Sequence, residues 1–363
     1  MKIMTVLGTR PEIIRLSLII KKLDKYCDHV LVHTGQNYNP ELNEIFFDEL
    51  NLRRPDYYLG VKADTFSEQI GRILIEAEKV FLKEKPERLL LLGDTNSALV
   101  SIIAKRMGIP VFHMEAGNRC YSSRVPEEVN RSIIDHSSTV LMPYTVNSKD
   151  NLIREGFPTE NVHVIGNPIY EVIRHYEKKI EESKVHAALG IEKGKYFLVT
   201  AHREENVDIR ERLESILAAL QQVQKKYKKP IICSLHPRTR KRMRKFGLRV
   251  RGREIRFLTP VGFFDFISLE KNAFCVVSDS GTVQEECCIF KVPNVTIRDV
   301  TERPETLACG SNFLASVDPQ TILRGIKVVI SESSNWRVPD EYSCENVSGS
   351  VLKILLGYRR EKG

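Results

Sequence analysis

VSDSGTVQEE, at residues 277–286, has the pattern of a strand, a sharp turn and the start of a helix. The apolar, β-prone run Ala273–Ser278 comes first, Ser280, Gly281 and Thr282 form the turn, and residues that suit a helix follow. Units of this kind build parallel sheets that are covered by helices, so the stretch predicts an α/β fold.

The same turn predicts a site for phosphate groups. Backbone N–H groups and the positive end of the helix dipole would face an anion above Ser280, Gly281 and Thr282, and a glycine lets that anion approach the backbone closely. Glu286 follows one helical turn later, and its carboxylate can accept hydrogen bonds from both hydroxyls of a ribose. We therefore interpret the stretch as a site for a nucleoside diphosphate; the alternative is an ordinary βα turn with Ser280 as helix N-cap.

Length and composition indicate a globular chain with two domains. The 363 residues are 42% hydrophobic, which allows a large core. The net charge of +8 raises the question of nucleic acid, but acids alternate with most of the basic residues and no basic motif is interleaved with aromatic residues. We expect no nucleic-acid partner; a modest positive excess also suits a small polyanionic ligand.

The cysteines and the N-terminus predict a location in the cytoplasm. Eight cysteines are scattered, without a C-x-x-C motif or a Cys/His cluster at metal spacing, so we expect reduced thiols and no metal. Arg10 and Glu12 interrupt the first apolar run too early for a secretory signal, and no later run is long enough to span a membrane.

Polar residues follow the strands predicted in the first half of the chain. Those strands are Ile3–Leu7, His29–His33, Arg88–Leu92, Val111–Met114 and Val162–Ile165. Arg10 follows the first strand and is a candidate phosphate ligand or a solvated loop residue, with Arg15 one helical turn further on. Asp94 and Glu115 follow two others, and Glu127 opens a helix. A doubly wound sheet would bring these carboxylates to one edge, although each could also be a helix cap or a surface acid.

The strand pattern restarts in the second half of the chain. Predicted strands at Tyr196–Thr200 and Pro230–Leu235 are followed by His202 and His236, which we interpret as phosphate contacts rather than as polar loop residues. The expected domains are residues 1–170 and 171–345. A terminal helix within residues 346–363 is expected to pack back towards the first domain.

Eight motifs together resemble the non-hydrolysing UDP-N-acetylglucosamine 2-epimerase family. The resemblance extends from about residue 3 to residue 357, and the motifs in order are GTRPEIIRLS, HTGQNY, GDTNS, HMEAGNR, VPEEVNR, AHREEN, SDSGTVQEE and RDVTERPE. It implies two Rossmann-like, doubly wound parallel-sheet domains facing a cleft, the glycosyltransferase-B architecture. It also implies a UDP-sugar substrate, no metal or nicotinamide cofactor, and a homodimer.

The resemblance also assigns roles to residues. It implies a catalytic group of Asp94, Glu115, Glu127 and His202. The residues expected to bind UDP or the substrate are Arg10, Arg15, His236, Phe266, Ser280, Gly281, Thr282, Glu286 and Arg303. Among these, Glu286 matches the ribose ligand and Phe266 the residue stacked near uracil.

The wording of three stretches is similar to the capsule-type branch of the family. NYNPELNEIFFDEL, MEAGNRCYSSRVPEEVNR and SGTVQEECCIF predict UDP-2-acetamido-2,6-dideoxy-L-talose as substrate and UDP-N-acetyl-L-fucosamine as product. The alternatives are conversion of UDP-N-acetylglucosamine to UDP-N-acetylmannosamine, a UDP-sugar glycosyltransferase and a catalytically silent binder of nucleotide sugars. Asn37–Pro40 departs from the loop that binds a regulatory second substrate molecule in the family's best-known branch, which puts activation by substrate in doubt.

Overall fold

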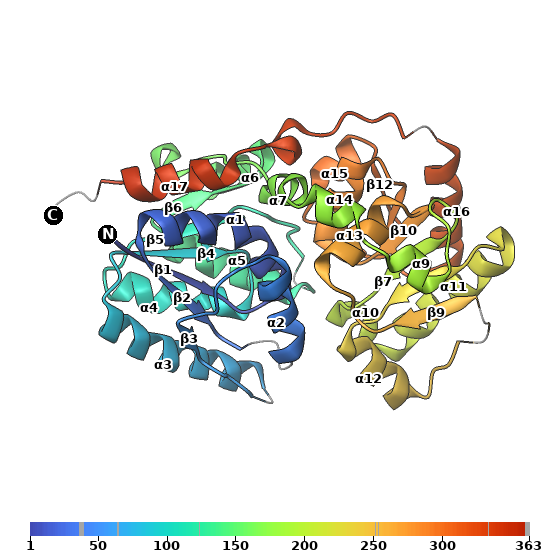
Figure 1. Cartoon of the computed structure of the whole chain (residues 1–363), viewed down its shortest axis with the longest axis horizontal. Helices are drawn as coiled ribbons and strands as arrows, with labels where there is room; N and C mark the ends of the chain where they lie inside the picture. Colours follow the sequence, from blue (N-terminus) through green and yellow to red (C-terminus); the bar gives the residue numbers. More distant parts are fainter. Residues whose placement is uncertain are drawn as a thin grey trace. The chain divides into compact units, whose positions relative to one another are not determined.

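The chain forms two compact units. Unit 1 comprises Met1–His175 together with Asp340–Gly363, and unit 2 comprises Tyr176–Pro339. The computed structural model, drawn in Figure 1, describes residues 1–35, 40–63, 65–122, 124–250, 252, 254–332 and 334–359, with backbone only for 40–43.

Unit 1 is built on a parallel sheet in the order β3-β2-β1-β4-β5-β6. Its strands are β1 (Lys2–Leu7), β2 (Asp28–His33), β3 (Tyr57–Tyr58), β4 (Arg88–Leu92), β5 (Val111–Met114) and β6 (Val140–Met142). The apolar run of β4 is buried throughout, as expected of a central strand that has helices on both faces. In the register between β4 and β5, Leu92 pairs with Met114, so the two strands end side by side.

Helices flank this sheet. They are α1 (Arg10–Tyr26), α2 (Pro40–Glu49), α3 (Phe66–Glu84), α4 (Ser101–Arg106), α5 (Pro126–Ser137), α6 (Val146–Arg154), α7 (Pro168–His175) and α17 (Val347–Gly357), with 3₁₀ turns at Asn96–Val100, Thr159–Asn161 and Asp340–Ser343. The last helix, α17, lies along α1 and α7, as the red and dark blue ribbons of Figure 1 show. The C-terminal segment therefore completes unit 1.

One predicted strand of the first half is wrong. Val162–Ile165 runs beside β6, where His163 N donates to Leu141 O at 2.9 Å, but it forms only an isolated bridge between Val162 and Leu141. The sixth strand is β6 itself, which the sequence pattern did not indicate. At three residues, β6 is too short to show the periodicity on which strand prediction depends.

Unit 2 repeats the architecture with a parallel sheet in the order β12-β11-β10-β7-β8-β9. The strands are β7 (Phe197–Thr200), β8 (Ile231–Ser234), β9 (Ile255–Leu258), β10 (Cys275–Ser278), β11 (Asn294–Thr296) and β12 (Asn312–Leu314). Its helices are α8 (Glu177–Glu181), α9 (Val185–Leu189), α10 (Glu204–Val207), α11 (Arg210–Tyr227), α12 (Pro237–Phe246), α13 (Phe263–Lys271), α14 (Gly281–Phe290), α15 (Pro304–Ala308) and α16 (Pro319–Ser331). The predicted fold class, two doubly wound parallel-sheet domains, is confirmed.

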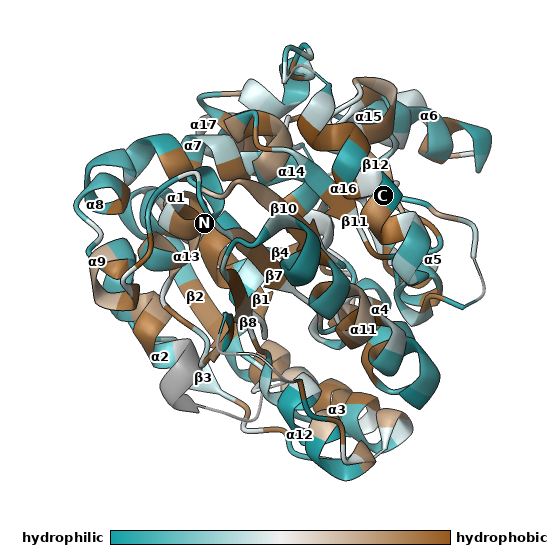
Figure 2. Ribbon diagram, turned by 90° about the vertical axis from the view of Figure 1, so that its right-hand side faces the viewer, coloured by the Kyte–Doolittle hydropathy of each residue, from teal (hydrophilic) through white to brown (hydrophobic). Residues whose placement is uncertain are grey.

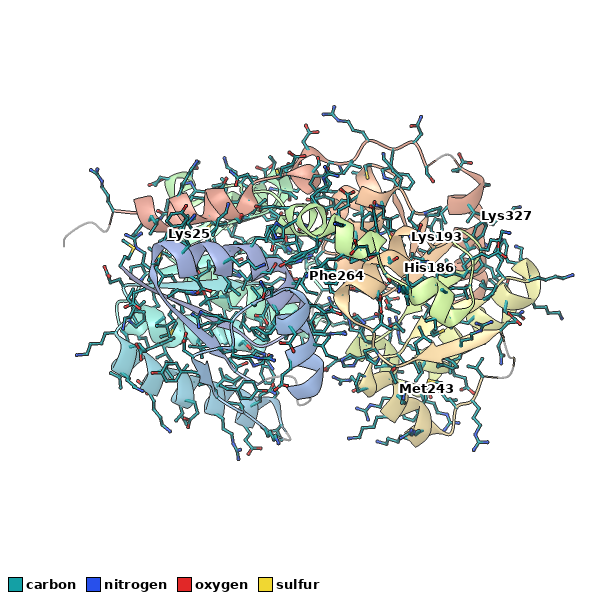
Figure 3. The ribbon with its side chains drawn as sticks, in the orientation of Figure 1. Lys25, His186, Lys193, Met243, Phe264 and Lys327 are labelled. Carbon is teal, nitrogen blue, oxygen red and sulfur yellow. The ribbon has the colours of Figure 1, made fainter. Side chains whose placement is uncertain are left out.

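Hydropathy follows this layering within each unit. The strands are predominantly brown in Figure 2, whereas α12 is predominantly teal. Met243, labelled in Figure 3, is one of the residues through which α12 packs against Val207 and Leu213. None of the described helices is both long and apolar enough to cross a lipid bilayer. All eight cysteines are free thiols.

Candidate active site

Two predicted catalytic carboxylates lie at the carboxyl edge of the unit 1 sheet. Asp94 follows β4 and Glu115 follows β5, and these strands are neighbours in register. Glu115 has a φ of +66°, a conformation that non-glycine residues rarely adopt. Such strain persists only where the surroundings impose it and is concentrated at functional sites.

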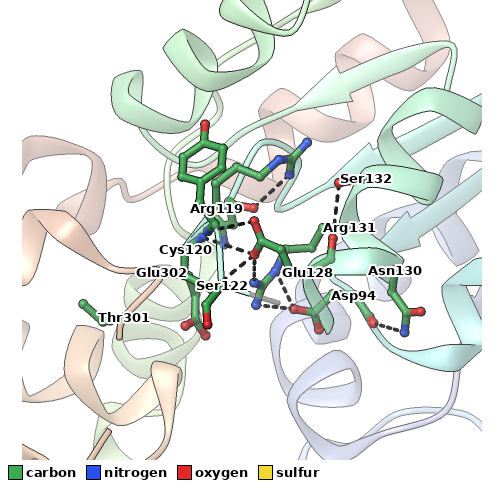
Figure 4. Close-up of polar contacts among 12 residues, drawn as sticks. Asp94, Arg119, Cys120, Ser122, Glu128, Asn130, Arg131, Ser132, Thr301 and Glu302 are labelled. Atoms are coloured by element: carbon green, nitrogen blue, oxygen red, sulfur yellow. Dashed lines mark hydrogen bonds and ion pairs between the residues drawn. The ribbon is translucent and has the colours of Figure 1, made fainter. Parts of the chain in front are cut away.

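Asp94 is held by an arginine from α5. Arg131 Nε donates to Asp94 Oδ2 at 2.9 Å and Arg131 Nη2 lies 2.7 Å from the same oxygen, as Figure 4 shows. Arg131 Nη1 donates to Glu128 Oε2 at 2.9 Å. The arginine is buried, whereas the Asp94 side chain is 20% exposed and can be reached by a ligand. This ion pair favours the ionised form of Asp94.

Glu115 is paired with Arg15, another predicted site residue. Arg15 Nη1 donates to Glu115 Oε2, and both side chains are buried. The Arg15 guanidinium also lies over the ring of Tyr144, 5.5 Å from its centroid. Asn118 Nδ2 donates to Glu115 Oε1 at 3.3 Å. Two carboxylates of the predicted catalytic group, Asp94 and Glu115, are therefore each paired with an arginine.

Glu127 lies in the first turn of α5, next to Pro126 at the start of that helix. A helix N-terminus stabilises negative charge through its dipole. Glu127 is one helical turn before Arg131, so the predicted catalytic acid and the arginine that binds Asp94 are on the same side of α5. The structure brings Arg15 into contact with Glu115 and Arg131 into contact with Asp94, and Glu127 precedes Arg131 by four residues on α5.

The turn between β1 and α1 carries Arg10, whose guanidinium lies 5.6 Å from the centroid of the Phe46 ring. Burial lowers the pKa of Arg10 from its usual value. Glu12 accepts hydrogen bonds from Thr9 N at 2.7 Å and from Thr95 Oγ1 at 3.0 Å. Burial raises the pKa of Glu12 to about 7, against these hydrogen bonds. Glu12 therefore joins the turn of Arg10 to the turn that follows Asp94.

A buried histidine connects the two carboxylate-bearing strand ends. His113 Nδ1 lies 2.7 Å from Asp135 Oδ1, and His113 Nε2 lies 2.8 Å from the carbonyl oxygen of Gly93. Asp135 also accepts from Arg119 Nη2 at 2.7 Å. Burial would raise the pKa of Asp135, but His113 and Arg119 outweigh it and hold that pKa below its usual value. Both ring nitrogens of His113 therefore contact oxygen atoms, and the ring links α5 to the end of β4.

Gly117 closes this arrangement at a φ of +76°. Its amide donates to Asp135 Oδ2 at 3.1 Å, and a Cβ at this position would lie 2.2 Å from the carbonyl oxygen of Ser148.

We expect Gly117→Ala to lower the free energy of unfolding by about 2 kcal/mol, measured by denaturant unfolding. The matched control is Gly71→Ala in helix α3, where nothing lies within 4 Å of the added Cβ and stability should rise slightly. Equal stability of the Gly117 variant and the wild type would contradict the prediction.

In unit 2, the predicted catalytic residue His202 is held in place by the buried Asp279. His202 follows β7, and its backbone N–H donates to Asp279 Oδ2 at 2.9 Å. Asp279 Oδ2 also accepts from Arg203 N at 3.0 Å and from Asn206 Nδ2 at 3.1 Å. His202 Nδ1 lies 3.2 Å from Asp279 Oδ1, and the His202 side chain is 38% exposed. Asp279 thus orients a histidine that remains accessible to a ligand.

His236 lies beside this histidine. The two rings are 5.9 Å apart between centroids, and His236 is the N-cap of α12, where its Nδ1 accepts from Arg238 N at 3.3 Å. Because β7 and β8 are neighbours in register, the loops that follow them bring these histidines together. The predicted phosphate contacts His202 and His236 are therefore adjacent.

The quoted stretch forms the predicted strand, turn and helix. Ser280 is the N-cap of α14, and its amide donates to Ser278 Oγ at 3.0 Å. Ser280 Oγ lies 3.3 Å from Thr282 Oγ1. A Cβ at Gly281 would lie 3.6 Å from Arg303 Nη2, so the guanidinium of the predicted site arginine lies against this turn. The first N–H groups of a helix have no partners within it, and together with Arg303 they suit an anion.

Glu286 and Phe266 lie on neighbouring helices. Glu286, on α14, is 5% exposed. Phe266, on α13, is partly buried and packs against the apolar cluster that includes Tyr196 and Leu269. Arg303 donates from Nε to Glu285, the residue before Glu286. The predicted ribose and uracil contacts thus belong to two helices that pack against each other.

Sequence reasoning missed the residues that hold these groups in place. Arg131 could have been found, because it follows Glu127 by four residues on a predicted helix. Asp279 lies inside the stretch quoted first, directly before the turn, but received no role. His113 lies in the motif HMEAGNR and received no role either. Of the loop Asn37–Pro40, whose sequence departs from the regulatory loop of the family's best-known branch, residues 37–39 lie outside the described residues. Within the described part of the chain, no three His, Cys, Asp or Glu side chains are grouped to hold a metal ion.

Comparison with known proteins identifies relatives over nearly the whole chain. Residues 21–356 match the family described as UDP-N-acetylglucosamine 2-epimerase. The UDP-N-acetylglucosamine 2-epimerase of Methanocaldococcus jannaschii is 42% identical over 347 residues, covering 93% of this chain and 95% of the relative. The UDP-2,3-diacetamido-2,3-dideoxy-D-glucuronate 2-epimerase of Pseudomonas aeruginosa is 36% identical over 338 residues, covering 92% of this chain and 93% of the relative.

A solved structure agrees with the fold of the whole chain. The crystal structure of the Methanocaldococcus jannaschii UDP-GlcNAc 2-epimerase, in complex with UDP-GlcNAc and UDP, superposes with a TM-score of 0.94. Sequence identity is 41%, and the superposition covers 99% of this chain and 100% of the other.

Proposed function

The chain belongs to the UDP-N-acetylglucosamine 2-epimerase family, and we propose that it inverts C2 of a UDP-2-acetamido-2-deoxy sugar by eliminating UDP and adding it back. The observation that carries the proposal is the placement of Asp94 and Glu115 after adjacent parallel strands, in a fold whose relative binds UDP-GlcNAc and UDP. The expected cytoplasmic location and homodimer are part of this proposal.

Elimination is needed because C2 of such a sugar is not adjacent to a carbonyl group. Its proton is too weakly acidic for direct removal by a carboxylate. If the C1–O bond breaks as the C2–H bond breaks, the electron pair of the C–H bond forms a C1–C2 double bond and UDP departs as an anion. A proton then returns to the other face of C2, and the UDP oxygen attacks C1 again. The protein must therefore supply a base, an acid and a site that stabilises the leaving group.

Carboxylates of unit 1 are suited to the proton transfers. Asp94 and Glu115 are paired with Arg131 and Arg15 respectively, which favours their ionised forms, and an ionised carboxylate can accept the C2 proton. Glu127 is the third candidate. We assign Asp94, Glu115 and Glu127 together to proton transfer at the two faces of C2.

Unit 2 is suited to the leaving group. The start of α14 at Ser280, Gly281 and Thr282 would bind the diphosphate, with His202, His236 and Arg303 as further contacts. Glu286 would accept from the ribose hydroxyls, and Phe266 would lie near the uracil. Arg10 and Arg15 are the unit 1 residues that we include in substrate binding. These roles rest on the geometry given above and on the resemblance of the motifs.

Two sugars are candidates for the substrate. The names of relatives at 36–42% identity support UDP-N-acetylglucosamine or a related D-sugar, so we propose UDP-N-acetylglucosamine as the first substrate to test. The wording of MEAGNRCYSSRVPEEVNR and SGTVQEECCIF is the observation that keeps UDP-2-acetamido-2,6-dideoxy-L-talose as the second.

Proton NMR in deuterated water tests the reaction and the sugar together. With UDP-N-acetylglucosamine, we expect deuterium at C2 and a second anomeric signal from UDP-N-acetylmannosamine. If C2 does not exchange in protein shown to bind UDP, the L-talose substrate is added to the same sample. No exchange with either sugar would contradict the epimerase proposal, and transfer of sugar to an acceptor would support the glycosyltransferase alternative.

Gly281 offers a direct test of the proposed phosphate site. A Cβ at this position would lie 3.1 Å from Glu302 Oε1 and would enlarge the backbone where the phosphate must approach. We expect Gly281→Ala to weaken UDP binding about tenfold or more in calorimetric titration. Its melting temperature should change little, because alanine is a better helix former than glycine. Undiminished UDP affinity would place the diphosphate elsewhere.

A further inference from the structure

The nucleoside end of the proposed site contains a second glutamate with no assigned role. Helix α13 carries Phe266 and Glu270 four residues apart, and α14 carries Thr282 and Glu286 with the same spacing, so each pair lies on one helix face. The two helices pack against each other. The inference that follows rests on the proposed function, because it takes Glu286 as the ribose ligand.

Glu270 is completely buried in surroundings that do not suit a negative charge. Its Oε1 accepts only a weak hydrogen bond from Cys287 Sγ at 3.5 Å. No donor among the described residues reaches its Oε2, and none of their Lys, Arg or His side chains forms an ion pair with it. Glu270 also lies in the last turn of α13, where the helix dipole disfavours negative charge. An ionised Glu270 would be a buried charge without compensation.

A proton on Glu270 removes both the buried charge and its unfavourable interaction with the helix dipole. Cys287 Sγ, the donor to Glu270 Oε1, belongs to the residue that follows Glu286 on α14, so the neighbouring carboxyl group is that of Glu286. Two carboxylates can share a hydrogen bond only if one of them carries a proton. Burial, together with the charge of Glu286, raises the pKa of Glu270 well above its usual value. A neutral Glu270 has an O–H group to donate, and its natural acceptor is the ionised Glu286.

We propose that Glu270 is a positioning residue that, in its neutral form, donates a hydrogen bond to the Glu286 carboxylate and fixes it to accept both ribose hydroxyls. A carboxylate has several acceptor positions, so Glu286 can accept from Glu270 and from the ribose diol together. The pair then selects ribonucleotides, because a nucleotide without the 2′-hydroxyl would leave a desolvated carboxylate oxygen without its donor.

Calorimetric titration of UDP and 2′-deoxy-UDP tests this selection in four proteins. Glu270→Gln keeps an N–H donor in the same place, Glu270→Met keeps the approximate length without a donor, and Glu286→Gln removes the acceptor charge. We expect the wild type and the Glu270→Gln variant to prefer UDP about tenfold. In the Glu270→Met and Glu286→Gln variants the preference should fall to about twofold or less. Thermal melting confirms that each variant is folded.

Infrared spectroscopy tests the protonation state without any ligand. The spectrum of the wild type minus that of Glu270→Gln should contain the C=O stretch of a protonated carboxyl at neutral pH. Absence of this band would overturn the inference, as would a folded Glu270→Met variant that keeps the wild-type preference. A wild type that fails to bind UDP would overturn the proposed function instead, and one that binds UDP and 2′-deoxy-UDP equally would remove Glu286 from the ribose.

Discussion

Asp94→Asn is expected to lower the rate of C2 epimerisation by a factor of about 100 or more while UDP affinity changes little. The substitution keeps the shape of the side chain and an oxygen that can accept from Arg131, but it removes the carboxyl group through which Asp94 is proposed to transfer a proton. Turnover and deuterium incorporation at C2, both measured by NMR, should fall together. UDP affinity should be preserved, because Asp94 is not among the residues proposed to bind UDP.

Glu128→Gln is the matched control for this variant. Glu128 binds the same arginine, with Arg131 Nη1 2.9 Å from its Oε2, and it also accepts from Cys120 N at 3.2 Å. Figure 4 shows Arg131 between Asp94 and Glu128. A control that loses as much turnover as Asp94→Asn would mean that displacement of Arg131, and not loss of the Asp94 carboxyl group, explains the effect. Normal turnover in Asp94→Asn would remove Asp94 from the catalytic group.

The strands that carry the site could be predicted almost to the residue. Arg88–Leu92 and Val111–Met114 have the predicted bounds, because a strand buried on both faces leaves a continuous apolar run in the sequence. The adjacency of Asp94 and Glu115 followed from the rule that parallel strands end at one edge. Strand β6 could not be predicted in this way, because three residues are too few to show a hydrophobic pattern. The longer apolar run Val162–Ile165 was predicted as the strand instead, but it forms only an isolated bridge.

The partners of the site residues could not be predicted, because they come from distant parts of the chain. Arg131 is 37 residues from Asp94, and Asp279 is 77 residues from His202. Each contact depends on side-chain direction across two elements, which a local pattern does not contain. The proposed neutral state of Glu270 is even harder to predict from the sequence, because it depends on burial and on the charge of Glu286. The motifs indicate the residues that we propose to contact the ligand, but they do not indicate the residues that hold those groups in place.

Asp279→Asn is expected to lower the free energy of unfolding by about 3 kcal/mol and turnover by about 100-fold. Asp279 is completely buried, and its oxygens accept from the backbone N–H groups of His202 and Arg203 and from Asn206 Nδ2. An asparagine would direct an NH₂ group at one or more of these donors, so hydrogen bonds would become repulsive contacts. The loop that carries His202 would then move away from its position beside the start of α14.

The control Asp208→Asn separates this effect from the general loss of an ion pair in unit 2. Asp208 Oδ2 lies 2.6 Å from both Arg238 Nη2 and Arg242 Nη2, but the side chain is 25% exposed, so solvent replaces the lost contacts. Denaturant unfolding should therefore show a loss below about 1 kcal/mol for the control. If Asp279→Asn lost stability but kept full turnover, Asp279 would support the fold alone. Asp279 also lies directly before the proposed phosphate-binding turn at Ser280. If Asp279→Asn lost turnover but His202→Ala did not, we would attribute the loss to displacement of that turn and not of His202.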